Sequence, residues 1–260
     1  MKIGIVTGKR GGFDAMLPLM LRLEASSDHS LVVYVVDQHT MGTFGGTAEY
    51  VENRLPDTEI IRIHAAEGDD FFTRSLNCAR VLSALPVGLV DYLVVYGDRG
   101  ESLAAAQCAL IYGVPIIHLE AGERTGTIDD QTRWAISSLA DICFAPSSKA
   151  FQRLVDRGHT RCILSGDLHL DAYADMASLE EVYSFLGHDG GDLAISLFHP
   201  DPDDPDGRNQ DQAIRSLLKL EYNVVAIYPC SDPGHQVLID NLLSWDGDID
   251  VFPNIPGPIF

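Results

Sequence analysis

Lysine is scarce in this 260-residue sequence, in which 18 basic residues accompany 38 acidic ones and the formal net charge is −20 at pH 7. A surface this acidic repels polyanions, so nucleic acid and anionic membrane are not expected partners. Most of the acidic residues are aspartates. Surfaces rich in Asp and poor in Lys resemble those of proteins in concentrated salt, where charge repulsion is screened. An acidic enzyme of an ordinary cytosol is the open alternative.

Cysteine is also sparse, and the five cysteines form no CxxC pair and show no metal-site spacing with histidine. We therefore expect reduced, mostly buried thiols in a cytoplasmic protein, and no metal site. No apolar run reaches the roughly 18 residues that a membrane span requires. Met1 leads directly into a strand-like run, so no signal peptide is expected.

Short apolar runs alternate with longer helical patterns along the chain. We expect strands at Lys2–Thr7, Ser30–Val36, Glu59–His64, Asp91–Tyr96, Pro115–Leu119, Ile142–Ala145, Cys162–Leu164, Leu193–Phe198, Asn223–Tyr228 and Ile249–Phe252. Most are rich in Val and Ile and apolar on both faces, as in a parallel sheet covered on each side. Helical patterns occupy Met16–Leu23, Phe71–Leu82, Glu101–Tyr112 and Asp130–Ala140. The alternation predicts an α/β fold built from βαβ units.

The pattern predicts two domains, a Rossmann-like domain over residues 1–168 and a partial second Rossmann-like domain over residues 169–260. The second contains three strand candidates, fewer than the roughly five or six of a doubly wound domain. Its polar loop carries four acids, Asp201, Asp203, Asp204 and Asp206. A solvated surface is favoured over a metal site for these.

Polar residues gather just after several strands, where open α/β sheets bind ligands. Arg10 lies in a glycine-rich turn after the first strand and can grip a phosphate, with a helix start beside it. The turn is neither GxGxxG nor a Walker loop, so a surface arginine in a plain turn is the alternative. His39 follows the second strand.

Two further clusters carry more chemistry. Asp98 and Arg99 close a buried strand and suit proton transfer beside a bound phosphate, or else form a structural ion pair. Glu120 follows the next strand, and Asp129 is expected to cap the next helix. Carboxylates crowded in one cleft raise one another's proton affinity, which favours acid–base chemistry. The structural alternatives are an N-cap for Asp129 or Asp130, a satisfied core histidine for His118 and a surface ion pair for Glu123 and Arg124.

Several ordered motifs resemble the hydrolysing UDP-N-acetylglucosamine 2-epimerases. The signature block is GDRGE at 97–101, then PIIHLEAGERTGTIDD with RWAIS. It extends to IVTGKR and LPLM near the start, SGDLHLD at 165–171, LFHP at 197–200 and IYPCSDPG at 227–234. GDR together with GTIDD is typical of the hydrolysing branch, whereas GTRPE and HGDT of the non-hydrolysing branch are absent. The resemblance implies the two-domain glycosyltransferase-B fold.

The resemblance also implies roles for individual residues. Asp98, Glu120 and Asp129 would be acid–base carboxylates acting on the sugar C2 proton, the leaving group and the added water. Arg10 and Arg99 would hold the diphosphate, and His199 would stabilise its developing charge. The expected substrate contacts further include His39, Glu123, Arg133 and Asp232. The implied reaction eliminates the nucleoside diphosphate to a glycal-like intermediate and then hydrates it with inversion at C2, without metal or redox cofactor.

The sequence departs from the family pattern at four places. RADY reads Arg10-Gly-Gly-Phe13, with Asp14 as an imperfect substitute for the acid. RHAI reads RWAI, with Trp134 in place of the histidine, and IYPN reads IYPC, ending at Cys230. The GNSSSG-type loop that holds the diphosphate is missing, so we expect a naturally short chain, a fragment, or completion by a separate polypeptide.

The leading hypothesis is a hydrolysing 2-epimerase, or its remnant, that converts a UDP-N-acetylglucosamine-type substrate to an N-acetylmannosamine-type sugar and UDP. A homodimer is expected by resemblance. The alternatives are a non-catalytic descendant that binds a sugar nucleotide or a partner, and a glycosyltransferase of the same architecture.

Overall fold

The computed structural model describes residues 1–68, 70–173, 176–230, 234–245 and 247–255. The chain forms two compact units, one of residues 1–42 with 46–174 and one of residues 43–45 with 175–260. The sequence predicts a boundary after residue 168, whereas the units divide after residue 174. The difference arises because the short helix α7 (His169–Ala172) packs against α1 (Arg10–Glu24) within the first unit.

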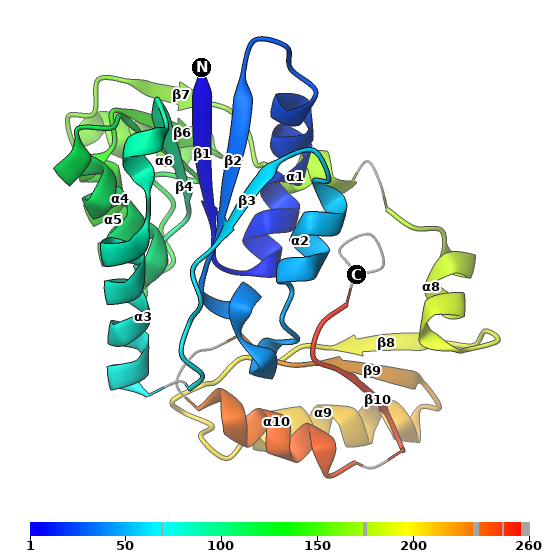
Figure 1. Ribbon diagram of the computed structural model, residues 1–260. Helices are drawn as coiled ribbons and strands as arrows, with labels where there is room; N and C mark the ends of the chain where they lie inside the picture. The colour runs from blue at the N-terminus through cyan, green and yellow to red at the C-terminus, as the bar shows by residue number, and fades with distance from the viewer. Residues whose placement is uncertain (69, 174–175, 231–233, 246, 256–260) are drawn as a thin grey trace. The chain divides into compact units, whose positions relative to one another are not determined.

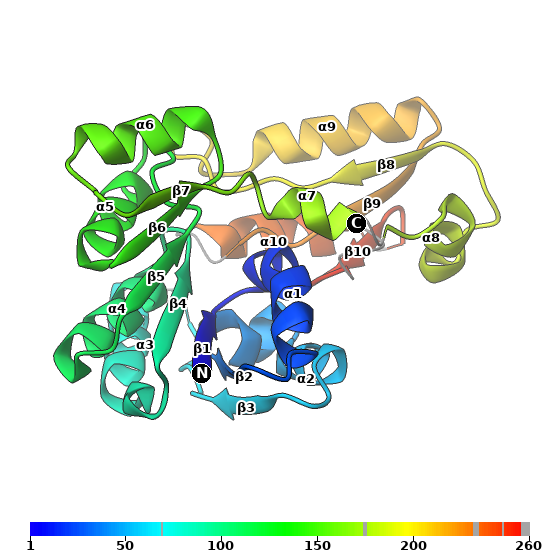
Figure 2. The same ribbon diagram turned by 90° about the horizontal axis from the view of Figure 1, so that it is seen from above.

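The first unit is built on a seven-stranded parallel sheet in the order β3-β2-β1-β4-β5-β6-β7 (Figures 1 and 2). Its strands are β1 (Lys2–Thr7), β2 (Ser30–Val35), β3 (Glu59–Arg62), β4 (Tyr92–Tyr96), β5 (Ile116–Leu119), β6 (Ile142–Ala145) and β7 (Cys162–Leu164). The strand order reverses between β1 and β4, the place where doubly wound sheets bind ligands. All pairs are parallel, so the carboxyl ends of the strands share one edge.

Helices cover both faces of this sheet (Figure 1). One face carries α3 (Phe71–Ala84), α4 (Gly100–Tyr112), α5 (Asp129–Leu139) and α6 (Ser148–Asp156), and the other carries α1, α2 (Ala48–Arg54) and α7. Val32 and Tyr34 of β2 enter the core under α3 and α4, while Val33 and Val35 enter the core under α1 and α2. Strands that are apolar on both faces therefore form two cores, as expected for a covered parallel sheet.

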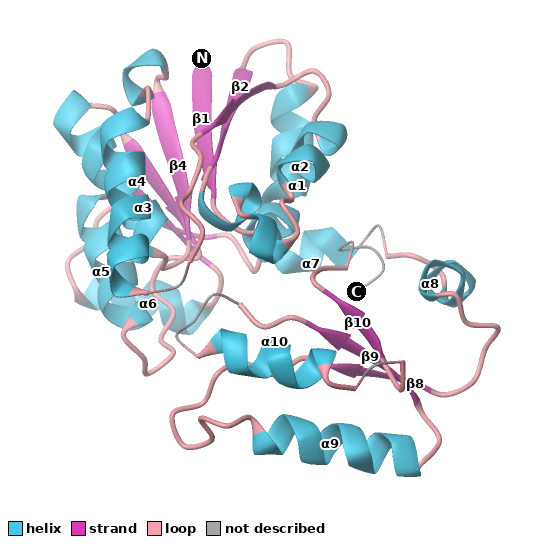
Figure 3. Ribbon diagram, turned by 60° about the horizontal axis from the view of Figure 1, so that its bottom comes forward, coloured by secondary structure: helices cyan, strands magenta, loops and turns pink. Residues whose placement is uncertain are grey.

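The second unit contains a three-stranded parallel sheet in the order β10-β9-β8 (Figure 3). Its elements are α8 (Leu179–Leu186), β8 (Leu193–Ser196), α9 (Arg208–Lys219), β9 (Asn223–Ile227), α10 (His235–Leu243) and β10 (Asp250–Phe252). Helices α9 and α10 pack on one face of this sheet, and Leu186 of α8 packs on the other. In the acidic loop, the Asp204 carboxylate accepts the backbone N–H groups of Arg208 (3.0 Å) and Asn209 (2.8 Å), which caps α9.

All ten predicted strands are present, with ends trimmed by one or two residues in most cases. The predicted α/β class is confirmed. No helix within the described ranges is both long and apolar enough to cross a lipid bilayer.

Candidate active site

The carboxyl edge of the first sheet gathers most of the residues that the sequence singles out. Arg10 follows β1, Asp98 follows β4 and Glu120 follows β5, all at the same edge. Asp129 opens α5, which packs on α4. We call Tyr96, Asp98, Glu120, Asp129, Arg133 and Asp167 the carboxyl-edge cluster.

The turn that carries Asp98 is held by a buried histidine. Gly97 adopts a left-handed conformation (φ 70°), which glycine tolerates without strain. Its carbonyl accepts the Nε2–H of His118 at 2.7 Å, and Ser137 Oγ lies 3.0 Å from the other ring nitrogen. Burial lowers the pKa of His118 to about 4, so the ring is neutral. His118 is thus a satisfied core histidine that fixes the Asp98 turn.

Asp98 is paired with Arg133 of α5. Arg133 Nη2 donates to Asp98 Oδ2, and its Nη1 donates to the Glu123 carbonyl at 3.0 Å. Burial raises the pKa of Asp98, and the nearby negative charge of Asp129 raises it further, while Arg133 and Lys9 act in the opposite direction. The negative charge of Asp129 therefore increases the proton affinity of Asp98. Arg133 positions Asp98, and the substrate contact expected of it stays a prediction.

Asp129 is the first residue of α5 and does not cap it, contrary to the sequence expectation. The N-cap is Ile128, which makes no side-chain cap bond. The neighbouring Asp130 ties down the loop instead, since its carboxylate accepts the N–H groups of Thr125 (2.7 Å) and Gly126 (2.9 Å). Asp129 is exposed and accepts one hydrogen bond, from Thr127 Oγ1 at 3.0 Å. Its carboxylate is thus left largely available.

Glu120 sits in a strained backbone conformation, with φ at 58°. Non-glycine residues in this region are uncommon and often mark functional sites. Burial and the adjacent Asp167 charge raise the pKa of Glu120 to about 7, against the partial stabilisation that its carboxylate gains from the Leu168 N–H at 3.4 Å. A carboxyl group with this pKa can both release and accept a proton near neutral pH.

Three residues of this site were not singled out from the sequence. His169 Nδ1 lies 2.9 Å from Asp167 Oδ1, and its Nε2 lies 3.5 Å from the Tyr96 hydroxyl. Burial raises the pKa of Tyr96, and so do the negative charges of Glu120, Asp167 and Asp98. Tyr96 therefore lies within electrostatic range of three carboxylates that follow three different strands. The SGDLHLD segment was noticed as a motif but carried no assigned role.

Arg99 forms an internal ion-pair network. Its Nη2 donates to Asp37 Oδ2 at 2.7 Å and its Nε donates to Glu101 Oε1 at 2.5 Å. Burial and the Glu101 charge raise the pKa of Asp37 to about 6, although Arg99 partly offsets them. Because two carboxylates already neutralise it, Arg99 has less charge to offer a diphosphate than the sequence suggests.

His39 and Glu123 also make mainly structural contacts. His39 is fully buried, and its two ring nitrogens lie 2.9 Å from Thr7 Oγ1 and 2.7 Å from Thr47 Oγ1. Burial lowers its pKa to about 3, so the ring is neutral and both nitrogens are occupied. Glu123 accepts the Ser147 hydroxyl at 2.6 Å, at the start of α6. Glu123 joins the carboxyl-edge cluster only through its backbone carbonyl, which accepts a hydrogen bond from Arg133 Nη1.

Arg10 is held where the sequence places it, at the first turn of α1. Its Nε donates to Asp14 Oδ2 at 3.3 Å, and its guanidinium carbon lies 4.5 Å from the centre of the Tyr50 ring. Tyr50 in turn donates to Asp14 at 2.9 Å. Asp14 thus pairs with Arg10, and its role as an imperfect substitute for the missing acid of the RADY pattern stays a prediction. The Arg10 Nη2 atom is buried and has no hydrogen-bond partner in the described structure.

The remaining predicted site residues belong to the second unit. His199 follows β8, and its Nδ1 lies 3.1 Å from Cys230 Sγ. Asp232 lies outside the described residues. Trp134, which replaces the family histidine, packs beside α6 with the Arg157 guanidinium 3.6 Å from its ring centre. Within the described ranges, no three His, Cys, Asp or Glu side chains are grouped to hold a metal ion.

The two parallel sheets and the charged carboxyl edge define the class of protein, a doubly wound α/β protein with a glycosyltransferase-B-like architecture. Solved structures share this fold. The UDP-GlcNAc 2-epimerase of Neisseria meningitidis bound to UDP-GlcNAc matches with a TM-score of 0.75 at 18% identity, over 100% of this chain and 74% of that chain. The Methanocaldococcus jannaschii UDP-GlcNAc 2-epimerase in complex with UDP-GlcNAc and UDP matches with a TM-score of 0.77 at 17% identity, over 99% and 75%.

The profile of the UDP-N-acetylglucosamine 2-epimerase family matches residues 22–257. The chain therefore belongs to this family of sugar-nucleotide epimerases. It is 30% identical to the UDP-N-acetylglucosamine 2-epimerase of Neisseria meningitidis serogroup B, over 98% of this chain and 70% of the relative. It is 27% identical to the hydrolyzing UDP-N,N'-diacetylbacillosamine 2-epimerase of Legionella pneumophila, over 91% and 66%. The chain thus spans about two thirds of the length of these relatives.

Proposed function

We propose that this chain provides the acid–base part of a hydrolysing sugar-nucleotide 2-epimerase that acts on a UDP-N-acetylglucosamine-type substrate. The observation that carries the proposal is the Tyr96 environment. The pKa of its hydroxyl is raised by burial and by the negative charges of Glu120, Asp167 and Asp98. These three carboxylates follow three different strands. Support for the hydrolysing branch comes from the GDR and GTIDD motifs and from the similarity to a relative described as hydrolyzing.

In this proposal, Glu120 and Asp98 divide the proton transfers. Glu120, with a pKa of about 7, exchanges the proton at sugar C2. Asp98, whose pKa is raised by burial and by Asp129, handles the proton of the leaving group or of the incoming water together with Asp129. The carboxylates lie at one sheet edge, as elimination and subsequent hydration at neighbouring sugar carbons require.

The leaving diphosphate is assigned to the start of α1. No acidic residue occupies the first turn of this helix, and no side chain caps it, so its free N–H groups and its dipole favour an anion. The unpartnered Nη2 of Arg10 adds a cationic donor. His199 is proposed to stabilise the charge that develops on departure.

Product analysis after incubation with UDP-N-acetylglucosamine tests the proposal. A hydrolysing enzyme releases UDP and free N-acetylmannosamine, whereas a non-hydrolysing one forms UDP-N-acetylmannosamine and releases no UDP. We expect Asp98→Asn and Glu120→Gln each to lower kcat by at least about 100-fold, the usual contribution of one acid–base group. Asp156→Asn on the exposed end of α6 is the matched control and should leave kcat unchanged. Undiminished turnover in both site variants would remove the assignment.

A non-catalytic descendant is the second candidate, favoured by the ion pairs of Arg99 with Asp37 and Glu101, which leave this arginine less charge for a diphosphate. It predicts binding of UDP-N-acetylglucosamine without release of UDP. Isothermal titration with the nucleotide sugar and with UDP alone separates this case from a chain that binds neither.

The chain is further proposed to form a homodimer, as its family resemblance implies. Light scattering coupled to size exclusion measures the mass directly. A mass of twice 28.4 kDa supports the dimer. A strictly monomeric chain contradicts it.

A further inference from the structure

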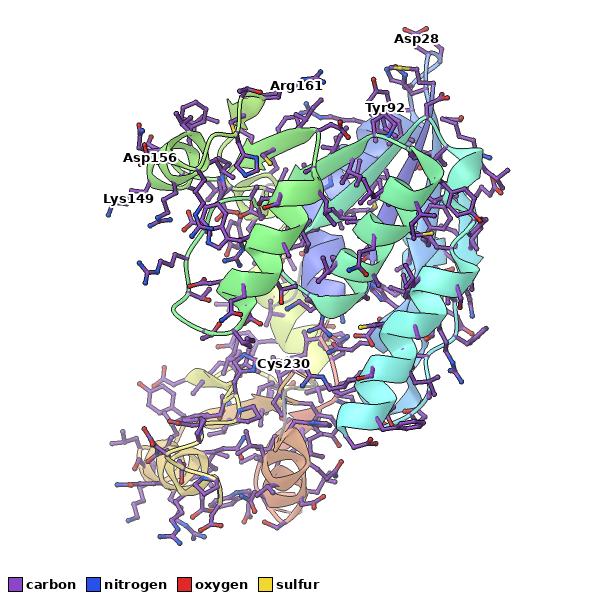
Figure 4. The ribbon with its side chains drawn as sticks, turned by 90° about the vertical axis from the view of Figure 1, so that its left-hand side faces the viewer. Asp28, Tyr92, Lys149, Asp156, Arg161 and Cys230 are labelled. Atoms are coloured by element: carbon purple, nitrogen blue, oxygen red, sulfur yellow. The ribbon has the colours of Figure 1, made fainter. Side chains whose placement is uncertain are left out.

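Cys230 and His199 form a close pair in the second unit. Cys230, which is labelled in Figure 4, follows β9, and His199 follows β8, the neighbouring parallel strand. The Cys230 Sγ lies 3.1 Å from His199 Nδ1, and the Cys230 backbone N lies 3.4 Å from the same nitrogen. Strand pairing brings the two residues together across 31 positions of sequence.

An imidazole in contact with a thiol accepts its proton and stabilises the thiolate, which is the nucleophilic form of cysteine. Cys230 is half-buried and His199 is exposed, so the pair is not sealed inside the core. The geometry is that of an activated thiol, with the base within hydrogen-bonding distance of the nucleophile.

The other four cysteines have a different environment. Burial raises the pKa of Cys78, Cys108 and Cys162, and it raises that of Cys143 to about 12. Cys143 is also near a histidine, but its sulfur is 4.0 Å from His159 Nδ1 and the residue is fully buried. These thiols are therefore held in the unreactive form.

We propose that Cys230 is a modification site at which the thiol, activated by His199, exchanges with small-molecule disulfides. His199 takes the thiol proton, and the Cys230 thiolate attacks one sulfur of the disulfide. The sulfur–sulfur bond of the small molecule breaks, a new bond joins Cys230 to one half, and the other half leaves as a thiolate. Cys230 is oxidised, the leaving sulfur is reduced, and the departing thiolate can recover the proton from His199.

The modification changes the surroundings of His199. The mixed disulfide removes the thiol from contact with Nδ1 and places a bulky polar group beside the ring. Reduction by an excess of free thiol reverses the exchange, because the bond formed is an ordinary disulfide. The chemistry of this site does not depend on the proposed epimerase function.

The test measures rates of modification by intact mass and peptide mapping, with glutathione disulfide and with iodoacetamide as probes at pH 7. Within the wild-type chain, we expect Cys230 to react at least about tenfold faster than Cys78 and Cys162, which are also half-buried. This comparison needs no variant. His199→Gln should slow the reaction of Cys230 about tenfold while leaving the rates at Cys78 and Cys162 unchanged.

Cys230→Ser should abolish the fast mass addition, and Cys162→Ser is the control that should retain it. Equal rates at Cys230, Cys78 and Cys162 in the wild type would overturn the proposal. An unchanged Cys230 rate in a folded His199→Gln variant would overturn the role of the histidine. Because the readout is mass, failure of the epimerase assay does not affect the outcome.

Discussion

Two carboxylates and one guanidinium share a confined space at the carboxyl ends of β2 and β4. Arg99 bonds both Asp37 and Glu101, and its side chain is 21% exposed. A buried charge network of this kind contributes little more stability than apolar packing would. Loss of one partner, however, leaves the other charges uncompensated. The network therefore matters more for the integrity of the site than for net stability.

Arg99→Met should lower the free energy of unfolding by about 3–5 kcal/mol, because two buried carboxylates then face each other without a cation. Urea denaturation at pH 7 measures the change. Arg208→Gln is the control, since Arg208 pairs with Asp206 at 82% and 64% side-chain exposure. It should change stability by less than about 1 kcal/mol. Equal effects of the two substitutions would contradict the network.

Glu120 should make stability depend on pH in a defined direction. Its pKa is about 7 in the folded chain against an ordinary 4.5. A carboxyl group with a raised pKa binds its proton more tightly in the folded chain than in the unfolded one. Its contribution to the free energy of unfolding is therefore present below pH 4.5 and is lost as the pH rises to 7. Glu120→Gln should therefore be more stable than wild type at pH 8, by roughly 1–2 kcal/mol after allowing for its partial exposure.

Thermal unfolding at pH 8 and at pH 4.5 checks this prediction, and the advantage of Glu120→Gln should vanish at the lower pH. Glu123→Gln serves as an opposite control. The Ser147 hydroxyl lowers the pKa of Glu123, so the ionised carboxylate of Glu123 stabilises the fold at pH values above its ordinary pKa. This control should be less stable than wild type at pH 8. A pH-independent difference for Glu120→Gln would rule out the raised proton affinity.

At the scale of elements, the loop from β5 to α5 approaches α6 through Gly122. Its φ is 83°, and a Cβ there would lie 2.5 Å from the Ala150 carbonyl oxygen and 2.9 Å from Leu154 Cγ. A side chain at this position therefore forces the loop away from α6. Because the same loop carries Glu120 and Glu123, the close approach of Gly122 to α6 also helps to position these two residues.

Gly122→Ala should destabilise the fold more than Gly126→Ala. Gly126 has nearly the same φ, 84°, but open space around its Cβ position. Both variants incur about 1–2 kcal/mol for a left-handed backbone, and only Gly122→Ala adds about 1–3 kcal/mol of overpacking. Chemical denaturation of the two variants side by side gives the difference. Equal losses would mean that the loop yields without strain.

The strands were predictable because each is a compact apolar run, and β1, β6 and β7 match their expected bounds. Helix α1 was predicted from Met16 but begins at Arg10. Gly11 and Gly12 weaken the local helix signal, and Pro18 lies inside the helix. Packing of Phe13 and Met16 into the core under α1 supplies what the local sequence lacks.

At the scale of the whole molecule, the net charge of −20 means that the folded chain repels itself. Added salt screens this repulsion, so the free energy of unfolding should rise between about 0.05 M and 1 M KCl. Urea denaturation across this range measures it, with sorbitol at matched osmolality as the control. A protein adapted to concentrated salt should keep gaining stability beyond 1 M. No gain up to molar salt would remove the saline interpretation.

The sequence by itself determined the α/β class, the strand positions, the family motifs and the collection of acids at strand ends, because these follow from local apolar runs and short patterns. Tertiary structure decided which partners the charged groups meet. The decisive pairs are Arg99 with Asp37, Asp98 with Arg133, Tyr96 with His169, and Cys230 with His199. Each joins residues far apart in the chain, and strand order and helix packing, which no local pattern encodes, bring them together.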